Sequence, residues 1–213
     1  MTYCKKICCV LAFLVLKTHL SVAGMATTNT SEIHKNASPE AIKIVTTYWN
    51  KLQILVASII QTNPDGKRIT GKLYLKKGKG NNAKLRLDYQ PDYKQQMLIK
   101  KSEVLLVDLT DGAVSAYPVS MTPASLILKP KLDFEKDVKL IDSQQVGKDV
   151  QIVLAHKDDE NGGLLILNFT IANGGCLLRW KVLDPQGNMT EVELIGDTMR
   201  ENDSKLVPDV LFE

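Results

Sequence analysis

Apolar residues recur at helical spacing between residues 38 and 52. Ser38, Pro39 and Glu40 are typical of a helix start, because a hydroxyl caps free amides, proline fits the first helical position and an acid suits the first turn. The apolar positions that follow share one side of such a helix: Ile42, Ile44, Val45, Tyr48, Trp49 and Leu52. We predict one amphipathic helix that packs this side on another element.

From residue 53 onward the apolar period changes to two, which indicates β-strands. Three runs each place their apolar residues on one face: Leu55, Ala57 and Ile59; Leu73 and Leu75; Leu85, Leu87 and Tyr89. Further strands are expected at 104–107, 114–119, 150–154, 164–171, 177–183 and 189–195. Turn residues recur at short intervals, as in Asp111-Gly112, so the sheet should be antiparallel and largely up-and-down.

One segment interrupts this alternation. Residues 122–128 read as a short helix that is apolar on nearly all sides, with Thr122 as its cap and Pro123 at the first position. About ten strands with only two short helices suggest an α+β fold. We expect a single, strongly curved antiparallel sheet with the helices over its open side.

Residues 1–26 have the pattern of a secretory signal peptide. Two lysines precede an apolar run over 7–16, and small-x-small cleavage sites end at Ala23 and Ala26. The run is about half of the ~20 residues that a membrane-spanning helix needs. We expect one soluble mature domain over residues 27–213, with an uncleaved anchor as the alternative.

Removing the expected signal changes the charge balance. Three of the 27 basic residues lie in it, which leaves 24 to balance the 24 acidic residues of the chain. A near-neutral domain argues against nucleic acid as a partner, because nucleic acid requires a concentrated basic face. Of the four cysteines only Cys176 remains, so a disulfide within the mature domain is excluded. We expect Cys176 to be a small apolar residue at a strand edge.

Patterns of catalysis and metal binding are scarce. None of the three histidines has a cysteine or another histidine at metal-ligand spacing. There is no Gly-x-Ser-x-Gly motif, no phosphate-binding glycine loop and no nucleophile with an obvious base. The acidic run at 158–160 lacks the alternating spacing of calcium ligands and is expected to be a solvated loop. We expect no enzyme, no cofactor and no metal site, and a secreted hydrolase is the least favoured alternative.

Two separated motifs point to a known family. Residues 61–67 and 71–75 form a strand, a Pro-Asp-Gly turn and a second alternating strand. Residues 177–187 follow the pattern Leu-x-Arg-Trp-x-Val-x-Asp-x-Gln-Gly. Together they resemble the LolA family, the periplasmic carriers of bacterial outer-membrane lipoproteins, over about residues 39–212. The resemblance implies an unclosed β-barrel of about ten or eleven strands that is covered by a helical lid.

Taken alone, the inward-facing apolar residues favour an ordinary sheet core. The resemblance assigns them other roles. It implies a cavity for the acyl chains of a lipoprotein, lined by Leu55, Ala57, Ile59, Leu73, Leu75, Leu85, Leu87, Tyr89 and Trp180. It implies a lid that includes Trp49, Leu126, Ile127 and Leu128. A lid packed into the empty cavity would compete with lipid for the same surface.

Lys77 departs from the family pattern. The family usually has arginine followed by proline where this chain has Lys77 and Gly78, and that arginine is held to bond the lid backbone and keep the empty carrier closed. Lysine lacks the planar fork of arginine, so we expect a weaker latch. We expect the Lys77 ammonium to point toward the backbone carbonyls of residues 122–128.

The partners implied by the resemblance are acylated lipoproteins as cargo, an inner-membrane ABC transporter of the LolCDE type as donor and a LolB-type outer-membrane acceptor. The carrier itself is expected to be a monomer in the periplasm. Within the same fold the alternative is a carrier or sensor of another lipid or envelope ligand. The sequence leaves both open.

Overall fold

The computed structural model describes residues 37–79, 82–100, 102–133, 136, 138–157 and 162–212. The expected signal peptide and the acidic run at 158–160 lie outside these residues. The described chain contains one α-helix, α1 (Pro39–Lys51), and strands β1 (Ile54–Thr62), β2 (Arg68–Lys76), β3 (Lys84–Tyr89), β4 (Gln95–Lys100), β5 (Glu103–Asp108), β6 (Val114–Pro118), β7 (Val138–Val146), β8 (Asp149–His156), β9 (Leu164–Thr170), β10 (Cys176–Leu183), β11 (Met189–Leu194) and β12 (Arg200–Glu201).

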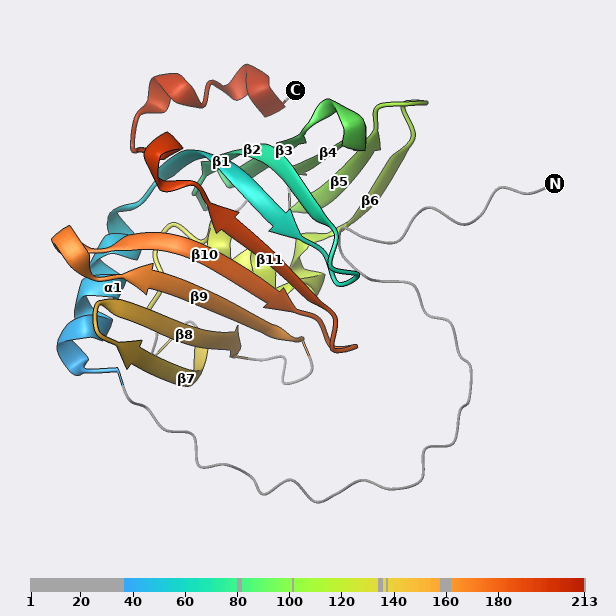
Figure 1. Ribbon diagram of the computed structural model, residues 1–213. Coiled ribbons are helices and arrows are strands. Elements are labelled where there is room, and N and C mark those ends of the chain that lie inside the picture. The colour runs from blue at the N-terminus through green and yellow to red at the C-terminus, as the bar shows by residue number, and fades with distance from the viewer. Residues whose placement is uncertain are drawn as a thin grey trace, which may run out of the picture.

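The strands form one antiparallel sheet (Figure 1). Its order is β6-β5-β4-β3-β2-β1-β11-β10-β9-β8-β7, and the two-residue β12 also pairs with β1. Most neighbours are consecutive hairpins, which confirms the up-and-down prediction. The pairing of β1 with β11 brings the first and last long strands together in the middle of the sheet.

Local sequence explains the elements that were predicted correctly. The Ser38 hydroxyl accepts a hydrogen bond from the Ala41 amide at 3.2 Å and so caps α1. The Pro-Asp-Gly turn joins β1 to β2, with Gly66 at a φ of 79° that an L-residue side chain disfavours. The strands β4 and β7 were not located from the sequence, although β4 places Met97 and Ile99 on the apolar face with period two.

The expectation of a strongly curled sheet was wrong. The sheet is not closed or strongly curled, and its two edges are β6 and β7, which follow one another in the chain. The segment between them does not form a hairpin. It contains the 3₁₀ helices η3 (Val119–Met121) and η4 (Pro123–Leu128), and η4 packs on β8, β9 and β10. Since this segment covers the sheet, the apolar face is buried without barrel closure.

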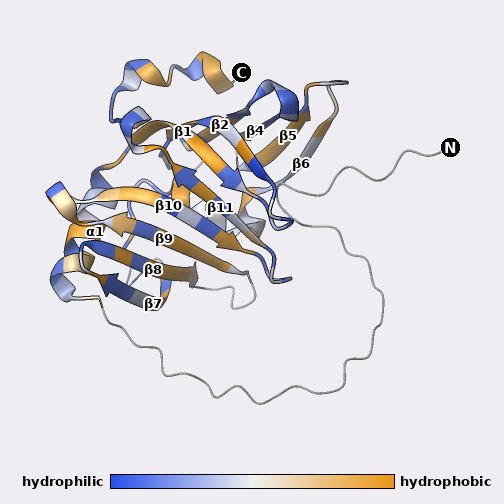
Figure 2. Cartoon of the chain, viewed as in Figure 1, coloured by the Kyte–Doolittle hydropathy of each residue, from blue (hydrophilic) through white to orange (hydrophobic). Residues whose placement is uncertain are grey.

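The core lies between one face of the sheet and the elements α1 and η4, which Figure 1 shows together behind β8–β11. Figure 2 shows apolar and polar residues alternating along the strands, so each strand contributes one side to this core. The rings of Tyr48 and Trp49 on α1 both pack edge-on against Phe169 of β9, with centroids 6.1 Å apart. The predicted amphipathic helix is therefore confirmed in place, and Val45, Tyr48, Trp49 and Leu52 of its predicted apolar side are buried in the core.

A smaller apolar cluster lies apart from this core. It joins Ile54 and Val56 of β1 to Val207 and Phe212 in the C-terminal segment. That segment carries the 3₁₀ helices η7 (Ser204–Leu206) and η8 (Asp209–Phe212). Basic residues of β2 and β3 hold it as well, since Lys76 and Lys84 both pair with Asp209.

Candidate functional site

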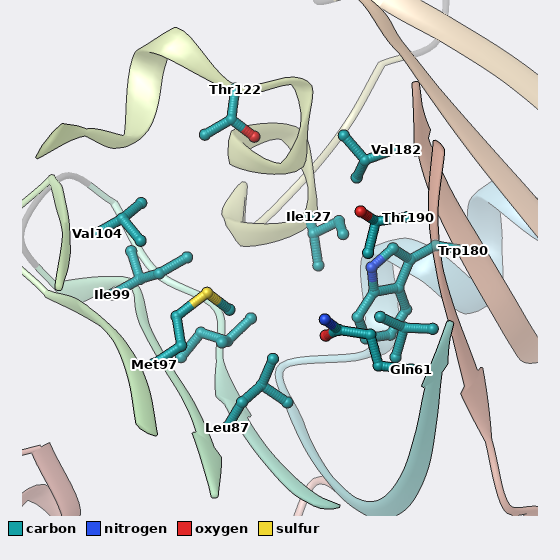
Figure 3. Close-up of a pocket in the computed structure, with 12 residues that line it drawn as sticks. Gln61, Leu87, Met97, Ile99, Val104, Thr122, Ile127, Trp180, Val182 and Thr190 are labelled. Carbon is teal, nitrogen blue, oxygen red and sulfur yellow. The ribbon is translucent and has the colours of Figure 1, made fainter. Parts of the chain in front are cut away.

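A small apolar pocket of about 50 Å³ lies between the sheet and η4 (Figure 3). It is lined by Gln61, Leu85, Leu87, Met97, Ile99, Val104, Thr122, Ile127, Trp180, Val182, Thr190 and Val192. These residues come from both halves of the sheet, β1–β6 and β7–β11. The pocket therefore depends on the pairing of β1 with β11, which joins the two halves. Its volume is well below the ~300–1,000 Å³ of typical ligand sites. In this state the pocket is too small for a long acyl chain.

The nine residues assigned to a cavity by the family resemblance all lie in the main apolar cluster. Leu85, Leu87 and Trp180 line the pocket itself. The other six are buried on the same sheet face beside it: Leu55, Ala57, Ile59, Leu73, Leu75 and Tyr89. The face is therefore continuous, but most of it is at present covered by α1 and η4 rather than by empty space.

The polar residues of the lining are neutral. Gln61 is 2% exposed, and both the oxygen and the nitrogen of its side-chain amide are hydrogen-bonded. It accepts a hydrogen bond from the Tyr89 hydroxyl at 2.9 Å and donates one to Asn63 Oδ1 at 2.8 Å. Burial raises the pKa of Tyr89, so its hydroxyl stays protonated at neutral pH. A lining without charge favours an apolar ligand.

The segment expected to act as a lid fills the space above the apolar face. Leu126, Ile127 and Leu128 of η4 are 0%, 2% and 6% exposed. Figure 3 shows Ile127 inside the pocket, between Trp180 on one side and the strands that carry Met97 and Ile99 on the other. The prediction of a short helix at 122–128 is correct in position, and the helix is of the tighter 3₁₀ type.

Lys77 lies at the end of β2, under α1. It is 5% exposed, and its Nζ donates a hydrogen bond to the carbonyl oxygen of Trp49 at 2.8 Å. The same Nζ lies 3.8 Å from the centroid of the Trp49 ring, a cation–π contact. The expected acceptor among residues 122–128 was wrong, because β2 ends beneath the last turn of α1, where a backbone carbonyl is left without a helical partner.

Burial sets the ionisation of Lys77. Desolvation lowers the pKa of its ammonium to about 7. Among the described residues its recorded contacts are the carbonyl and the ring of Trp49. Neither contact carries a full negative charge that would offset desolvation. The proton on Lys77 is therefore weakly held compared with that of an ordinary lysine.

Gly78, the next residue, contacts η4. Its amide donates to the carbonyl of Leu128 at 3.4 Å, a long hydrogen bond. A Cβ at this position would lie 2.6 Å from the backbone carbon of Asn82. A proline at this position would have no amide hydrogen to donate. Two consecutive residues, Lys77 and Gly78, thus hold α1 and η4 respectively.

The end of α1 is also joined to the segment that follows η4. Asn50 Nδ2 donates to the Leu132 carbonyl at 3.2 Å, and Asn50 Oδ1 accepts from the Leu132 amide at 2.8 Å. Gln53 Nε2 donates to the Pro130 carbonyl at 3.3 Å. We call α1 together with residues 122–133 the cover, because these contacts make the two parts a single layer over the sheet.

Ser125 and His156 lie in contact, although nothing in the sequence connected them. Ser125 Oγ lies 2.8 Å from His156 Nε2, so a hydroxyl of η4 bonds the end of β8. No carboxylate is recorded on the histidine ring within the described chain. The Ser125 amide donates to the Thr122 carbonyl and so is not available as an oxyanion donor. The pair is better explained as a third attachment of the cover than as a catalytic dyad.

The architecture and the pocket define a class of proteins in which an open β-sheet and a helical cover enclose an apolar, uncharged site. The family model "Outer membrane lipoprotein carrier protein LolA" matches residues 50–206, and the chain belongs to this family. The family is one of periplasmic carriers rather than of enzymes.

Comparison with solved structures finds similar chains of low sequence identity. A DUF1329 family protein from Desulfovibrio piger is 14% identical with a TM-score of 0.50, over 81% of this chain and 94% of that one. A putative outer membrane lipoprotein-sorting protein domain from Vibrio parahaemolyticus is 13% identical (TM-score 0.45; 82% and 96%). A LolA superfamily protein from Nitrosomonas europaea is 14% identical (TM-score 0.39; 81% and 97%). No curated protein matches the chain.

Across the described residues, none of the helices combines the length and the apolar character needed to cross a membrane.

Proposed function

We propose that this protein is a periplasmic carrier that binds the acyl chains of lipoproteins and moves them from the inner to the outer membrane. The observation that supports this most directly is the position of the cover. Leu126 and Ile127 occupy the apolar face of the sheet, and the remaining pocket of about 50 Å³ has an uncharged lining.

The cover and an acyl chain would compete for one surface. Each buried methylene contributes about 0.8 kcal/mol, so a long chain gains enough to displace apolar side chains that otherwise fill the site. The acyl chain must first displace η4 from the apolar face. The free energy that η4 gains from its own burial therefore offsets part of the free energy gained by burying the acyl chain. Net affinity then stays low enough for the cargo to be released, which a carrier requires.

The proposed route needs a donor and an acceptor. An inner-membrane transporter of the LolCDE type would load the carrier, and a LolB-type acceptor in the outer membrane would unload it. The expected signal peptide over residues 1–26 would deliver the protein to the periplasm. N-terminal sequencing of the periplasmic protein should find a start at Gly24 or Thr27, and an intact Met1 on a membrane-bound protein would exclude a soluble carrier.

The identity of the cargo is tested by native mass spectrometry of the protein purified from its own periplasm. Retained diacylated or triacylated lipopeptides, together with saturable binding of a synthetic lipopeptide, are the expected result. Retention of a phospholipid or another lipid in their place would make the protein a carrier or sensor of that lipid. A protein that retains no lipid and binds no lipopeptide would refute the proposal.

A further inference from the structure

The two edges of the sheet are protected to different extents. At β7 the Ser143 carbonyl accepts a hydrogen bond from the Ala37 amide at 3.3 Å, and Gln145 Oε1 accepts one from the Ser38 amide at 3.2 Å. A register shift between Leu140 and Asp142 further disrupts that edge. Within the described chain, β6 has no comparable partner on its outer side.

The hydrogen bonds at the two ends of the β5–β6 hairpin show which backbone groups of β6 face outward. The Asp108 amide donates to the Ala113 carbonyl, and the Val119 amide donates to the Ser102 carbonyl, both at 2.9 Å. Odd-numbered residues of β6 therefore bond β5, because bonding alternates along an antiparallel strand.

The even-numbered residues of β6 thus face away from β5. The amides and carbonyls of Val114 and Ala116 point outward, and so does the carbonyl of Pro118. These five groups are spaced as a further strand would require. Pro118 has no amide hydrogen to offer and lies at the end of the strand, where proline is tolerated.

The side chains of this edge are suited to a partner. Residues 114–118 include no charged side chain, although natural proteins usually protect an edge with lysine or another charge. Val114 is 58% exposed, and Leu109 in the adjoining turn is 57% exposed. The edge is therefore both open and partly apolar.

The end of β6 borders the pocket. Tyr117 pairs with Val104 of β5, which lines the pocket, and Thr122, another lining residue, follows Pro118 by four positions. The Tyr117 hydroxyl is buried and has no hydrogen-bond partner within the described chain. A ligand that fills the pocket and extends past Val104 would emerge along this strand.

We propose that β6 binds the extended polypeptide segment that follows the acylated residue of the cargo, by antiparallel strand addition to Val114, Ala116 and Pro118. This inference rests on the proposed function. β6 runs toward the pocket, whereas a polypeptide that leaves an acyl group held there runs away from it. The two strands are therefore antiparallel, and about five cargo residues fit the length of β6.

The test compares two synthetic probes, a diacylglyceryl-cysteine amide and the same lipid followed by a six-residue uncharged linker. Ala116→Pro removes an outward amide without removing any bond to β5, and Ala116→Val keeps that amide. We expect Ala116→Pro to weaken binding of the linker-bearing probe about tenfold and to leave the linker-free probe unchanged, which also shows that the variant is folded. Ala116→Val should bind both probes like the parent.

Amide hydrogen exchange of residues 114–118 is the second measurement. We expect protection to increase with the linker-bearing probe and to stay unchanged with the linker-free probe. Equal binding of both probes by parent and Ala116→Pro would overturn the role of β6 while leaving the carrier function intact. If neither probe binds the parent, the carrier function itself fails. Protection that rises with protein concentration and without probe would assign the edge to a second copy and overturn this proposal.

Discussion

Lys77 Nζ lies 2.8 Å from the carbonyl oxygen of Trp49 and 3.8 Å from the centroid of its indole ring. One lysine thus bonds the backbone of the cover helix and stacks on a side chain of the same residue. Because Gly78 bonds Leu128 in the second part of the cover, the end of β2 contacts both parts at once. This junction is where we expect the balance between closed and open states to be set.

Replacing Lys77 by methionine should favour the open state. The variant loses the hydrogen bond to the Trp49 carbonyl, which as an ordinary hydrogen bond contributes about 0.5–1.5 kcal/mol, and leaves that carbonyl without its donor. We expect Lys77→Met to bind a labelled lipopeptide as tightly as the parent or more tightly, and to transfer it more slowly to the acceptor. Lys77→Arg should restore transfer, since the guanidinium offers more donors in a fixed plane.

Lys76→Met is the matched control for this experiment. Lys76 is the neighbouring residue, but it pairs with Asp209 of the C-terminal segment rather than with the cover. Its loss should leave transfer unchanged, because an exposed ion pair contributes little. Equal transfer rates for Lys77→Met and the parent would show that Lys77 does not hold the cover.

The closed state should become more stable as the pH rises above 7. The pKa of Lys77 is about 7 in this structure and near 10.5 when the side chain is exposed. Between these values the unfolded or open protein binds more protons, so closing releases a proton and is favoured by higher pH. The free energy of unfolding should rise by up to about 1.4 kcal/mol per pH unit from Lys77 alone.

The measurement is urea denaturation of the parent and of Lys77→Met between pH 6 and about 9. The difference between their unfolding free energies should change with pH in favour of the parent. A difference that does not vary with pH would mean that the Lys77 ammonium is not desolvated in the closed state. Below pH 7 proton release no longer stabilises the closed state. We therefore expect lipopeptide to bind most tightly there, because it competes with the least stable closed state.

Gly78 should tolerate neither alanine nor proline. A Cβ would lie 2.6 Å from the backbone carbon of Asn82, and backbone atoms cannot move aside as a side chain can. We expect Gly78→Ala to lower the unfolding free energy by about 1–3 kcal/mol. Gly78→Pro should cost more, because it also removes the amide that bonds Leu128.

Gly196→Ala is the control for this prediction. A Cβ at Gly196 would meet no atom within 4 Å, so the substitution should change stability by less than about 0.5 kcal/mol. Denaturant midpoints measure all three variants. If Gly78→Ala is as stable as Gly196→Ala, the close approach to Asn82 is relieved at little cost.

A charge in the pocket should block cargo binding before it unfolds the protein. Leu87 lines the pocket, so a carboxylate there can reach water when the cover opens. We expect Leu87→Glu to abolish lipopeptide binding while the protein remains folded. Leu165→Glu is the comparison, because Leu165 is fully buried in the core and does not line the pocket. That variant should lose several kcal/mol or fail to fold.

Circular dichroism and lipopeptide binding distinguish the two variants. Unfolding of Leu87→Glu to the same extent as Leu165→Glu would indicate that the pocket is part of an ordinary packed core. Normal lipopeptide binding by a folded Leu87→Glu protein would place the cargo elsewhere.

The sequence by itself determined the local structure of this protein. The Ser38 cap fixed the start of α1, the alternation in 85–89 fixed a strand, and the turns at Gly66 and Gly112 fixed two hairpins. Each of these features depends on residues a few positions apart, so periodicity and turn chemistry are sufficient. The two family motifs are local in the same sense, which is why the family could be identified without a structure.

The tertiary structure alone decided what those elements do together. It placed β1 beside β11, left β6 and β7 as the two edges of a sheet without strong curling, and put Trp49 rather than residues 122–128 against Lys77. It also brought Ser125 to His156 across 31 positions. Such contacts depend on the packing of segments far apart in the chain, and the free energies that select one arrangement come from the whole core rather than from any local pattern.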